Sequence, residues 1–293
     1  MSRRTGLPPE DIPRLHAVLD SFLNQEVYSL AVAGREMAQN QPSIPMEDRM
    51  VYFFEIYGTL PRAGPGDDAS TRKAYRMMKN VPKNPKILDI GCGPGMQTME
   101  LARLSKGKVV ALDNHQPFLD RVNKDAKALG LSQHVETLSQ DMNTMDFKPE
   151  SFDIIWAEGA LYQMGFENGL KICRPMLKKN GYIGVTELVW LKDNPSPEAR
   201  EWAKEYEAIK NVPDNISLFH NNGYEVIGRF TLPVSSWSEN YYDPMQERIN
   251  ELRKKYRDNA AAAEVIDSAQ LEINGFKKCS GEVGYEFFVG RRK

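Results

Sequence analysis

The stretch ILDIGCGPGMQTMELA, residues 87–102, decides the fold of this chain of 293 residues. It reads as a short apolar strand, a Gly-x-Gly-x-Gly turn at Gly91, Gly93 and Gly95, and then a helix. A glycine turn at the carboxyl end of a first strand lets a ligand approach the backbone, and the next helix N-terminus offers it unpaired N–H groups. The stretch therefore predicts a nucleotide-like ligand at the start of an α/β sheet.

From position 85 onward, short apolar runs alternate with helical segments. The predicted strands are KILDIG, KVVALD, HVETLSQD, FDIIWAE, GYIGVTELVWL, YEVIGRFTLP and GYEFFVGRR. Helices are predicted over 97–105, 116–129 and GLKICRPML. Strands that do not alternate in polarity, separated by helices, indicate a parallel sheet covered on both faces. The predicted fold class is α/β, doubly wound.

Three ligands compete for the glycine turn. A phosphate-binding P-loop needs Gly-Lys-Ser/Thr at its end, which is absent here. A dinucleotide fingerprint needs glycine at position 96, where Met96 stands, so this interpretation is weakened but stays open. S-adenosylmethionine has no phosphate and needs carboxylates instead. Asp89, Asp113 and Asp141 end the first three predicted strands and so share one sheet edge, although each alone is more often a helix cap.

At DIGCGPG, ALDNHQPFLD and SQDM the chain resembles the class I, seven-stranded S-adenosylmethionine-dependent methyltransferases. The resemblance runs in order over residues 50–293. It implies a mostly parallel sheet of order 3-2-1-4-5-7-6 with the last strand antiparallel. It also implies that the backbone of Gly91 and Gly93 holds the amino-acid end of the cofactor, and that Gly95 chiefly permits close packing of the next helix.

The same resemblance implies the other cofactor contacts. Asp113 binds the ribose, with Asn114 beside it, while Asp141 and Met142 frame the adenine. His115 follows the ribose acid; a role in the pocket is weighed against the more common solvated histidine at a helix start.

RAGPGDD, residues 62–68, resembles a loop that folds over the bound cofactor in bacterial and archaeal members of this family. As a lid, it would bring Arg62 to the cofactor carboxylate and exclude water from the sulfonium. A plain glycine–proline turn between two helices is an equal alternative. The predicted cofactor-binding set is Arg62, Gly64, Asp89, Gly91, Gly93, Gly95, Asp113, Asn114, Asp141 and Met142.

Glu158 ends the fourth predicted strand, which lies beside the first in this fold and reaches over the cofactor's methyl group. It is the catalytic candidate, because it would contact a cationic or hydroxylated acceptor or accept its proton. A cap for the helix near Ala160, or a bond to the cofactor's ammonium group, are the alternatives. Contact is favoured over proton abstraction, because positioning accounts for much of the rate of methyl transfer.

The acceptor is predicted to be a small molecule. Methyltransferases of DNA or peptide amides commonly show Asn/Asp-Pro-Pro-Tyr/Phe where this chain has Ala157-Glu158-Gly159-Ala160. Aromatic stripes are usually core, but WSENYYD, residues 237–243, combines three aromatic rings with two acids, which suits a wall against a partly cationic ligand. The predicted substrate-binding set is Tyr57, Glu158, Tyr162, Trp190, Trp237, Tyr241 and Tyr242.

The predicted activity is methyl transfer by in-line displacement to an amine or hydroxyl acceptor. The alternatives are a quinone or lipid-like acceptor methylated at carbon, and a non-catalytic protein that binds S-adenosylmethionine. No metal is predicted, because no His, Asp or Glu residues have the spacing of a metal site.

Composition excludes several partners. A net charge of −2 with only short basic clusters predicts neither nucleic acid nor membrane as a partner. Three cysteines without a C-x-x-C pair, and no apolar run of signal-peptide or membrane-span length, fit a soluble cytoplasmic protein. A homodimer is compatible with the sequence.

Two units are predicted. Residues 1–84 form a helical N-terminal extension and lid, with amphipathic helices within 10–40. Residues 85–293 form the cofactor-binding domain, with helical cap insertions at about 192–222 and 235–275.

Overall fold

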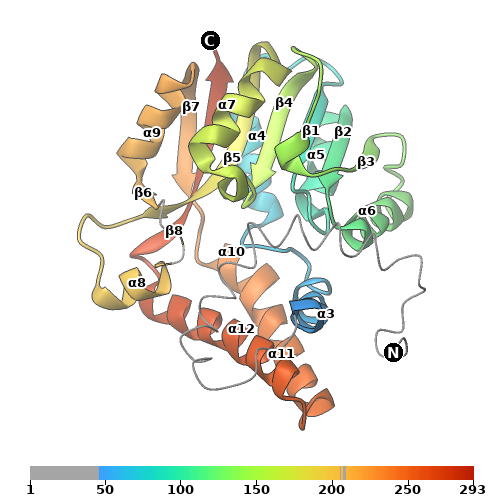
Figure 1. Ribbon diagram of the computed structural model, residues 1–293. Coiled ribbons are helices and arrows are strands. Elements are labelled where there is room, and N and C mark those ends of the chain that lie inside the picture. The colour runs from blue at the N-terminus through green and yellow to red at the C-terminus, as the bar shows by residue number, and fades with distance from the viewer. Residues whose placement is uncertain (1–45, 205, 207–208) are drawn as a thin grey trace.

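The computed structural model describes residues 46–293 except 205, 207 and 208 (Figure 1). The helices predicted within residues 10–40 lie outside the described residues. Among the helices of the described part, none is long and apolar enough to cross a membrane.

One sheet forms the centre of the molecule. Its strands are β1 (Lys86–Ile90), β2 (Lys108–Asp113), β3 (Val135–Ser139), β4 (Phe152–Glu158), β5 (Leu177–Trp190), β6 (Lys210–Asn211), β7 (Tyr224–Thr231) and β8 (Val283–Arg292). The order is β3-β2-β1-β4-β5-β8-β7, and β6 pairs with the end of β5. Strand β8 is antiparallel to both neighbours. Leaving aside the two-residue β6, this confirms the predicted order 3-2-1-4-5-7-6 and the doubly wound α/β class.

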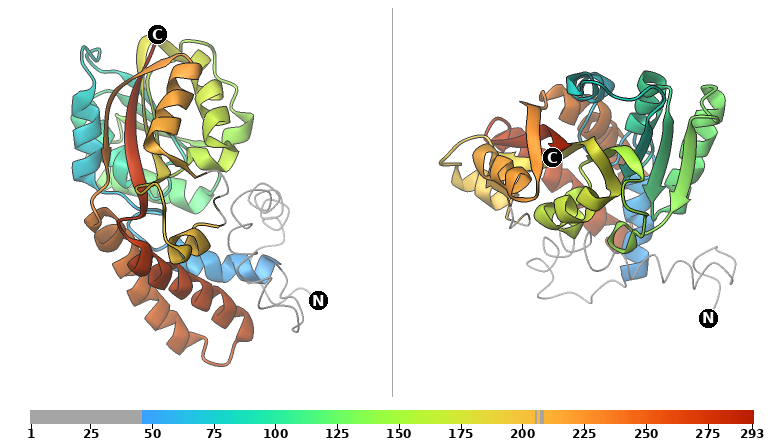
Figure 2. Two further views of the ribbon diagram at one scale, coloured as in Figure 1. Left: turned by 90° about the vertical axis from the view of Figure 1, so that its left-hand side faces the viewer. Right: turned by 90° about the horizontal axis from the view of Figure 1, so that it is seen from above.

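Helices cover both faces of the sheet (Figure 2). They are α4 (Asp68–Met77), α5 (Met96–Ser105) and α6 (Gln116–Ala128) on one face, and α7 (Phe166–Met176) and α9 (Val212–Asn221) on the other. The segment of α9 was predicted as part of a cap insertion at 192–222. It contacts β7 and α7 instead, because Phe219 of α9 packs into the apolar cluster on that face of the sheet.

The remaining α-helices and one π-helix lie beyond the carboxyl ends of the parallel strands (Figure 1). They are α3 (Met46–Tyr57), α8 (Pro197–Trp202), α10 (Ser235–Trp237), the π-helix η4 (Ser238–Tyr242), α11 (Asp243–Lys255) and α12 (Ala260–Cys279). We call this group the cap. Helix α3 packs on α11 and α12, so a segment predicted as part of an N-terminal unit is joined to helices near the C-terminus.

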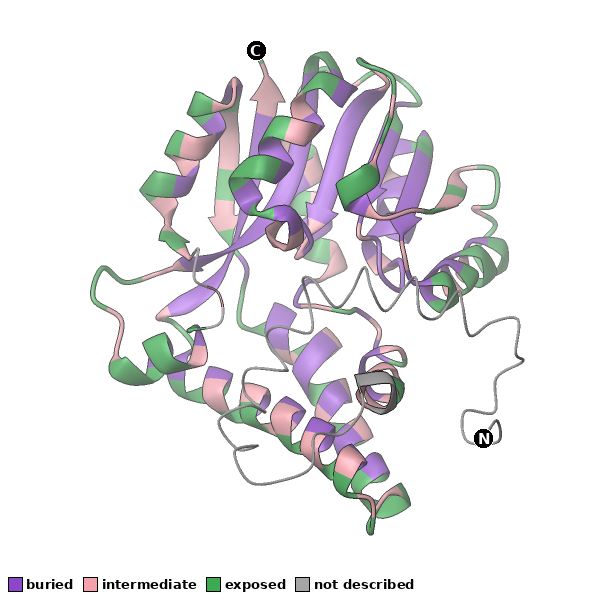
Figure 3. Ribbon diagram, viewed as in Figure 1, coloured by how far each residue is buried: buried purple, intermediate pink, exposed green. Residues whose placement is uncertain are grey.

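The cap and the sheet share one hydrophobic cluster. Ile154 and Trp156 of β4 belong to the same buried cluster as Ile249, Ile266 and Phe276 of the cap, and all five are at most 5% exposed. Buried residues accordingly continue from the sheet into the facing sides of the cap helices (Figure 3). Burial of apolar area on this scale holds the cap in a fixed position over the strand ends.

Candidate functional site

The glycine turn between β1 and α5 adopts backbone conformations that favour glycine. Gly91, Gly93 and Gly95 have φ of +65°, +52° and +88°. A Cβ at Gly91 would lie 2.6 Å from the Cβ of Ala160, and one at Gly95 would lie 2.5 Å from a methyl group of Val122. Gly91 therefore permits a close approach to the end of β4, and Gly95 permits the start of α5 to pack on α6.

Asp113 holds the turn in place from the end of β2. Its Oδ2 accepts a hydrogen bond from the Gly93 amide at 2.9 Å, and its Oδ1 accepts one from the His115 amide at 2.8 Å. Burial raises the pKa of the Asp113 carboxyl, and the backbone hydrogen bonds lower it again in part. A carboxylate has about four acceptor positions, so each oxygen keeps one for a ligand hydroxyl.

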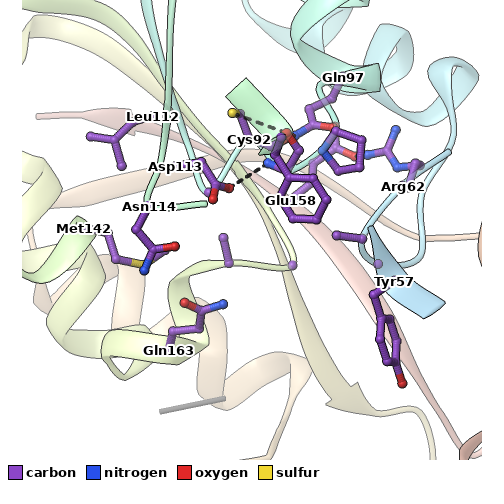
Figure 4. A pocket seen from close by; sticks show the side chains of 18 of the residues that line it. Tyr57, Arg62, Cys92, Gln97, Leu112, Asp113, Asn114, Met142, Glu158 and Gln163 are labelled. Atoms are coloured by element: carbon purple, nitrogen blue, oxygen red, sulfur yellow. Dashed lines mark hydrogen bonds and ion pairs between the residues drawn. The ribbon is translucent and has the colours of Figure 1, made fainter. Parts of the chain in front are cut away.

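A cavity of about 110 Å³ lies beside the glycine turn, and we call it the turn cavity (Figure 4). Eight of the ten predicted cofactor residues line it: Arg62, Gly64, Gly91, Gly93, Asp113, Asn114, Asp141 and Met142. Gln97, Leu112, Phe118 and Gln163 also line it and were not predicted. The structure therefore brings the ends of β1, β2 and β4 and the loop after β3 together around one space.

Asp89 and Gly95 do not line the turn cavity. Asp89 is fully buried at the end of β1, where its Oδ2 accepts a hydrogen bond from Thr98 Oγ1 at 2.6 Å. Within the described part of the chain, its Oδ1 is buried without a hydrogen-bond partner. Burial raises the pKa of Asp89 to about 7.

Glu158 forms a buried ion pair with Arg62, whose Nη2 donates to Glu158 Oε2. The two side chains are 1% and 4% exposed. Glu158 Oε1 accepts further hydrogen bonds from Thr71 Oγ1 at 2.7 Å and from Trp156 Nε1 at 2.8 Å. The following 3-10 helix, Leu161–Met164, has no side-chain cap, so Glu158 does not have the capping role that was its alternative. Its catalytic role stays a prediction.

Arg62 itself retains a free donor. Its Nη1 is buried and has no hydrogen-bond partner among the residues that the structure describes. Arg62 lines the turn cavity, and an unsatisfied buried donor of this kind is costly unless a ligand meets it.

The loop 62–68 is attached to the cap. The Gly66 amide donates to the Ser236 carbonyl at 2.9 Å, and Asn240 Nδ2 donates to the Gly66 carbonyl at 3.2 Å. Asp67 caps α4 by accepting from the Ser70 amide, and it also accepts from Ser236 Oγ. Residues 62–65 of the loop thus line the turn cavity, while its far end is bound to α10 and η4. Its role as a lid stays a prediction.

A second cavity, of about 530 Å³, lies between the sheet and the cap, and we call it the cap cavity. Five predicted substrate residues line it: Tyr57, Tyr162, Trp237, Tyr241 and Tyr242. Trp190 lines neither cavity, and Glu158 lines only the turn cavity. The two cavities share the lining residues Phe53, Tyr57, Ala63, Gly64, Pro65, Gly159 and Tyr162, so they adjoin each other.

Glu272 of α12 also lines the cap cavity, and sequence reasoning missed it. Its carboxylate accepts hydrogen bonds from three tyrosine hydroxyls: Tyr57 at 3.0 Å, Tyr241 at 3.2 Å and Tyr242 at 3.1 Å. Burial raises the pKa of Glu272 above its ordinary value, and the three hydrogen bonds lower it again only in part. The available signal was its spacing on the helix: Glu272 is three residues after Ala269 and four before Phe276, which are both buried.

His115 is neither solvated nor in either cavity. It precedes α6, is 9% exposed, and stacks on Phe54 of α3 with ring centroids 3.8 Å apart. Desolvation lowers the pKa of His115 to about 4. Its ring thus joins the cofactor-facing side of the sheet to the cap.

Comparison with known proteins agrees with this architecture. Residues 87–181 match a family described as a methyltransferase domain. A sterol 24-C-methyltransferase of Candida albicans is 31% identical over 162 residues, which are 52% of this chain and 43% of that protein. The chain thus spans less than half the length of this curated relative.

Solved structures share the fold. YjhP of E. coli superposes with a TM-score of 0.74 at 19% identity, covering 83% of this chain and 99% of that one. A SAM-dependent methyltransferase of Geobacter sulfurreducens, solved with S-adenosyl-L-homocysteine, gives 0.73 at 17% identity, covering 86% and 100%. The fold is that of a Rossmann-like α/β domain. More specifically, residues 87–181 form a methyltransferase domain.

Proposed function

We propose that this protein binds S-adenosylmethionine in the turn cavity and transfers its methyl group to a small molecule in the cap cavity. The observation that carries the proposal is the shared wall: Gly64, Gly159 and Tyr162 line both cavities, so ligands in the two spaces would touch. The Geobacter sulfurreducens relative was solved with S-adenosyl-L-homocysteine, which supports the choice of cofactor.

The residues at the turn cavity fit this cofactor. Asp113 offers an acceptor position on each carboxylate oxygen to a pair of hydroxyls, as a ribose presents them. The unpaired Arg62 Nη1 suits a carboxylate. When bound, the cofactor supplies an electrophilic methyl group on a sulfonium.

The chain's own contribution is positioning and exclusion of water. The loop 62–68, bound to the cap through Gly66, covers the side of the turn cavity that faces the cap. Tyr57 and Tyr162 border both spaces, so they would hold an acceptor against the cofactor.

Methylation at carbon is a second candidate for the reaction. The relative in Candida albicans is named as a sterol 24-C-methyltransferase, and the cap cavity is rich in aromatic rings that suit an apolar acceptor. A third alternative is a protein that binds the cofactor without catalysis. It differs from both enzymes in the transfer assay described below, because it would transfer no methyl group.

The test is an Asp113→Ala variant, with Asp120→Ala as a control because Asp120 is an exposed acid on α6. We expect Asp113→Ala to weaken S-adenosylhomocysteine binding by about 1.5–3 kcal/mol in calorimetry, because charge-assisted hydrogen bonds are lost. Asp120→Ala should bind as the parent does. Unchanged affinity in a folded Asp113→Ala variant would refute the ribose role.

Transfer is tested separately with methyl-labelled S-adenosylmethionine and pooled small-molecule extract. Label in small molecules, reduced in Asp113→Ala, supports the enzyme. Binding of the cofactor without any transfer supports the non-catalytic alternative and contradicts the proposal.

A further inference from the structure

We infer that the acceptor binds with a positively charged group, such as an ammonium, against Glu272 in the cap cavity. The inference rests on the proposed function, because it names the class of acceptor for that site. Its evidence is independent of the turn cavity. It consists of a partly buried acid, the groups around that acid and the cavity it faces.

The charge of Glu272 has no counter-ion in the described part of the chain. All its side-chain hydrogen bonds come from the neutral hydroxyls of Tyr57, Tyr241 and Tyr242. Two lysines also line the cavity, but Lys204 pairs with Glu201 at 2.5 Å, and Lys278 is exposed. Acids shielded from water are ordinarily paired with a cation, whereas among the described residues the partly buried Glu272 carboxylate is paired only with phenols.

The three phenols keep Glu272 ready to bind a cation. Donated hydrogen bonds stabilise the ionised carboxylate without neutralising it, so its field extends into the cavity. A carboxylate has about four acceptor positions, so three donors leave room for one more partner.

The rest of the wall suits the same ligand. Besides the three phenols, the aromatic rings of Trp202, Tyr206, Trp237 and Tyr285 line the cavity. Aromatic faces attract cations, and the attraction increases when water is excluded. A fixed negative charge surrounded by rings therefore favours a cationic group over a neutral group of equal shape.

The named relatives do not decide this point. The match to the methyltransferase family ends at residue 181, whereas Glu272 lies in α12. The acceptor side of the cavity is built mainly from segments beyond that match, so the acceptor class has to be inferred from the cavity itself.

The experiment compares two probes of equal shape, benzyltrimethylammonium and neopentylbenzene, which differ only in carrying N⁺ or C. Binding is measured by calorimetry on the full chain saturated with S-adenosylhomocysteine, so that the turn cavity is filled. We expect the parent protein to bind the cation at least ~10-fold more tightly, the usual scale of a buried charge contact. Equal affinity for the two probes would overturn the inference.

Glu272→Gln should remove the preference for the cation and leave affinity for the neutral probe and for S-adenosylhomocysteine unchanged. Asp267→Asn is the matched control, since Asp267 is an exposed acid on the same helix. It should keep the preference. A Glu272→Gln variant that still prefers the cation would overturn the inference.

A second variant covers the case in which Glu272→Gln does not fold. Tyr241→Phe with Tyr242→Phe removes two donors and keeps both rings and the carboxylate. The preference for the cation should weaken and return as the pH is raised, because loss of two donors raises the pKa of Glu272. A preference that stays lost at high pH would overturn the inference. Failure of the parent to bind S-adenosylhomocysteine would contradict the proposed function instead, so the two failures are distinguishable.

Discussion

The two cavities lie at the same end of the sheet, yet they are built in opposite ways. Most of the turn cavity comes from residues 91–163, where each strand is followed directly by its functional side chain. The cap cavity is assembled from α3, α8, the segment 237–242, α12 and β8, which are far apart in the sequence. The turn cavity therefore follows from a local sequence motif, whereas the cap cavity follows from how distant helices pack together.

This difference suggests where specificity resides. A turn after a strand is fixed by backbone geometry, so its ligand is shared among many proteins of the fold. Helices added beyond the strand ends are held mainly by side-chain packing, so their lining can change without disturbing the sheet. The cofactor is thus expected to be general and the acceptor particular to this chain.

Glu158 and Arg62 both line the turn cavity, and breaking their ion pair should have the largest effect. Glu158→Gln leaves the Arg62 guanidinium buried beside a neutral side chain. Removing one partner of a buried pair typically costs about 3–5 kcal/mol, and we expect the free energy of unfolding in urea to fall by this amount. Turnover should also fall further than cofactor affinity if Glu158 contacts the acceptor.

The control is the double variant Arg62→Met with Glu158→Gln, which removes both charges. Its loss of stability should be well below the sum of the two single losses, because the two residues are coupled. Additive losses would show that the Arg62 and Glu158 side chains do not stabilise each other in the folded protein.

The sequence predicted the turn cavity better than the cap cavity, for physical reasons. Asp113 could be placed because strand ends of a parallel sheet meet at one edge. Glu272 could not, because its place depends on how α12 packs against tyrosines that lie 30, 31 and 215 residues earlier in the chain. Trp190 is the opposite case. It was predicted to bind the substrate, but at the end of β5 its ring packs against the apolar core and lines neither cavity.

The stacked pair of His115 and Phe54 tests whether the cap is coupled to the sheet. With a folded pKa of about 4, His115 stays neutral where the unfolded chain, with a histidine pKa near 6.5, binds a proton. The contribution of neutral His115 to the free energy of unfolding is fully present above pH 6.5, and it decreases as the pH falls towards 4. The loss should reach about 3 kcal/mol at the acid end.

The measurement is the free energy of unfolding between pH 4 and 7 for the parent and for His115→Phe, which keeps a ring against Phe54. Other groups, including Asp89, contribute equally to both profiles, so the difference isolates His115. Parallel profiles would mean that His115 titrates in the folded protein as it does in the unfolded chain.

Gly91 provides the test confined to the turn cavity, and Gly130 is its control. Both have positive φ, +65° and +69°. Alanine in this left-handed backbone conformation should therefore lower the free energy of unfolding by about 1–2 kcal/mol at either position. Only at Gly91 would the new Cβ meet another atom closely, at 2.6 Å from Ala160, whereas nothing lies within 4 Å at Gly130. Gly91→Ala should therefore lose about 1–3 kcal/mol more than Gly130→Ala in unfolding experiments.

Gly91→Ala should also weaken S-adenosylhomocysteine binding, while Gly130→Ala binds normally. Equal losses at the two positions would show that the turn can accommodate a Cβ at position 91. The close approach of Gly91 to Ala160 would then not determine the shape of the turn cavity.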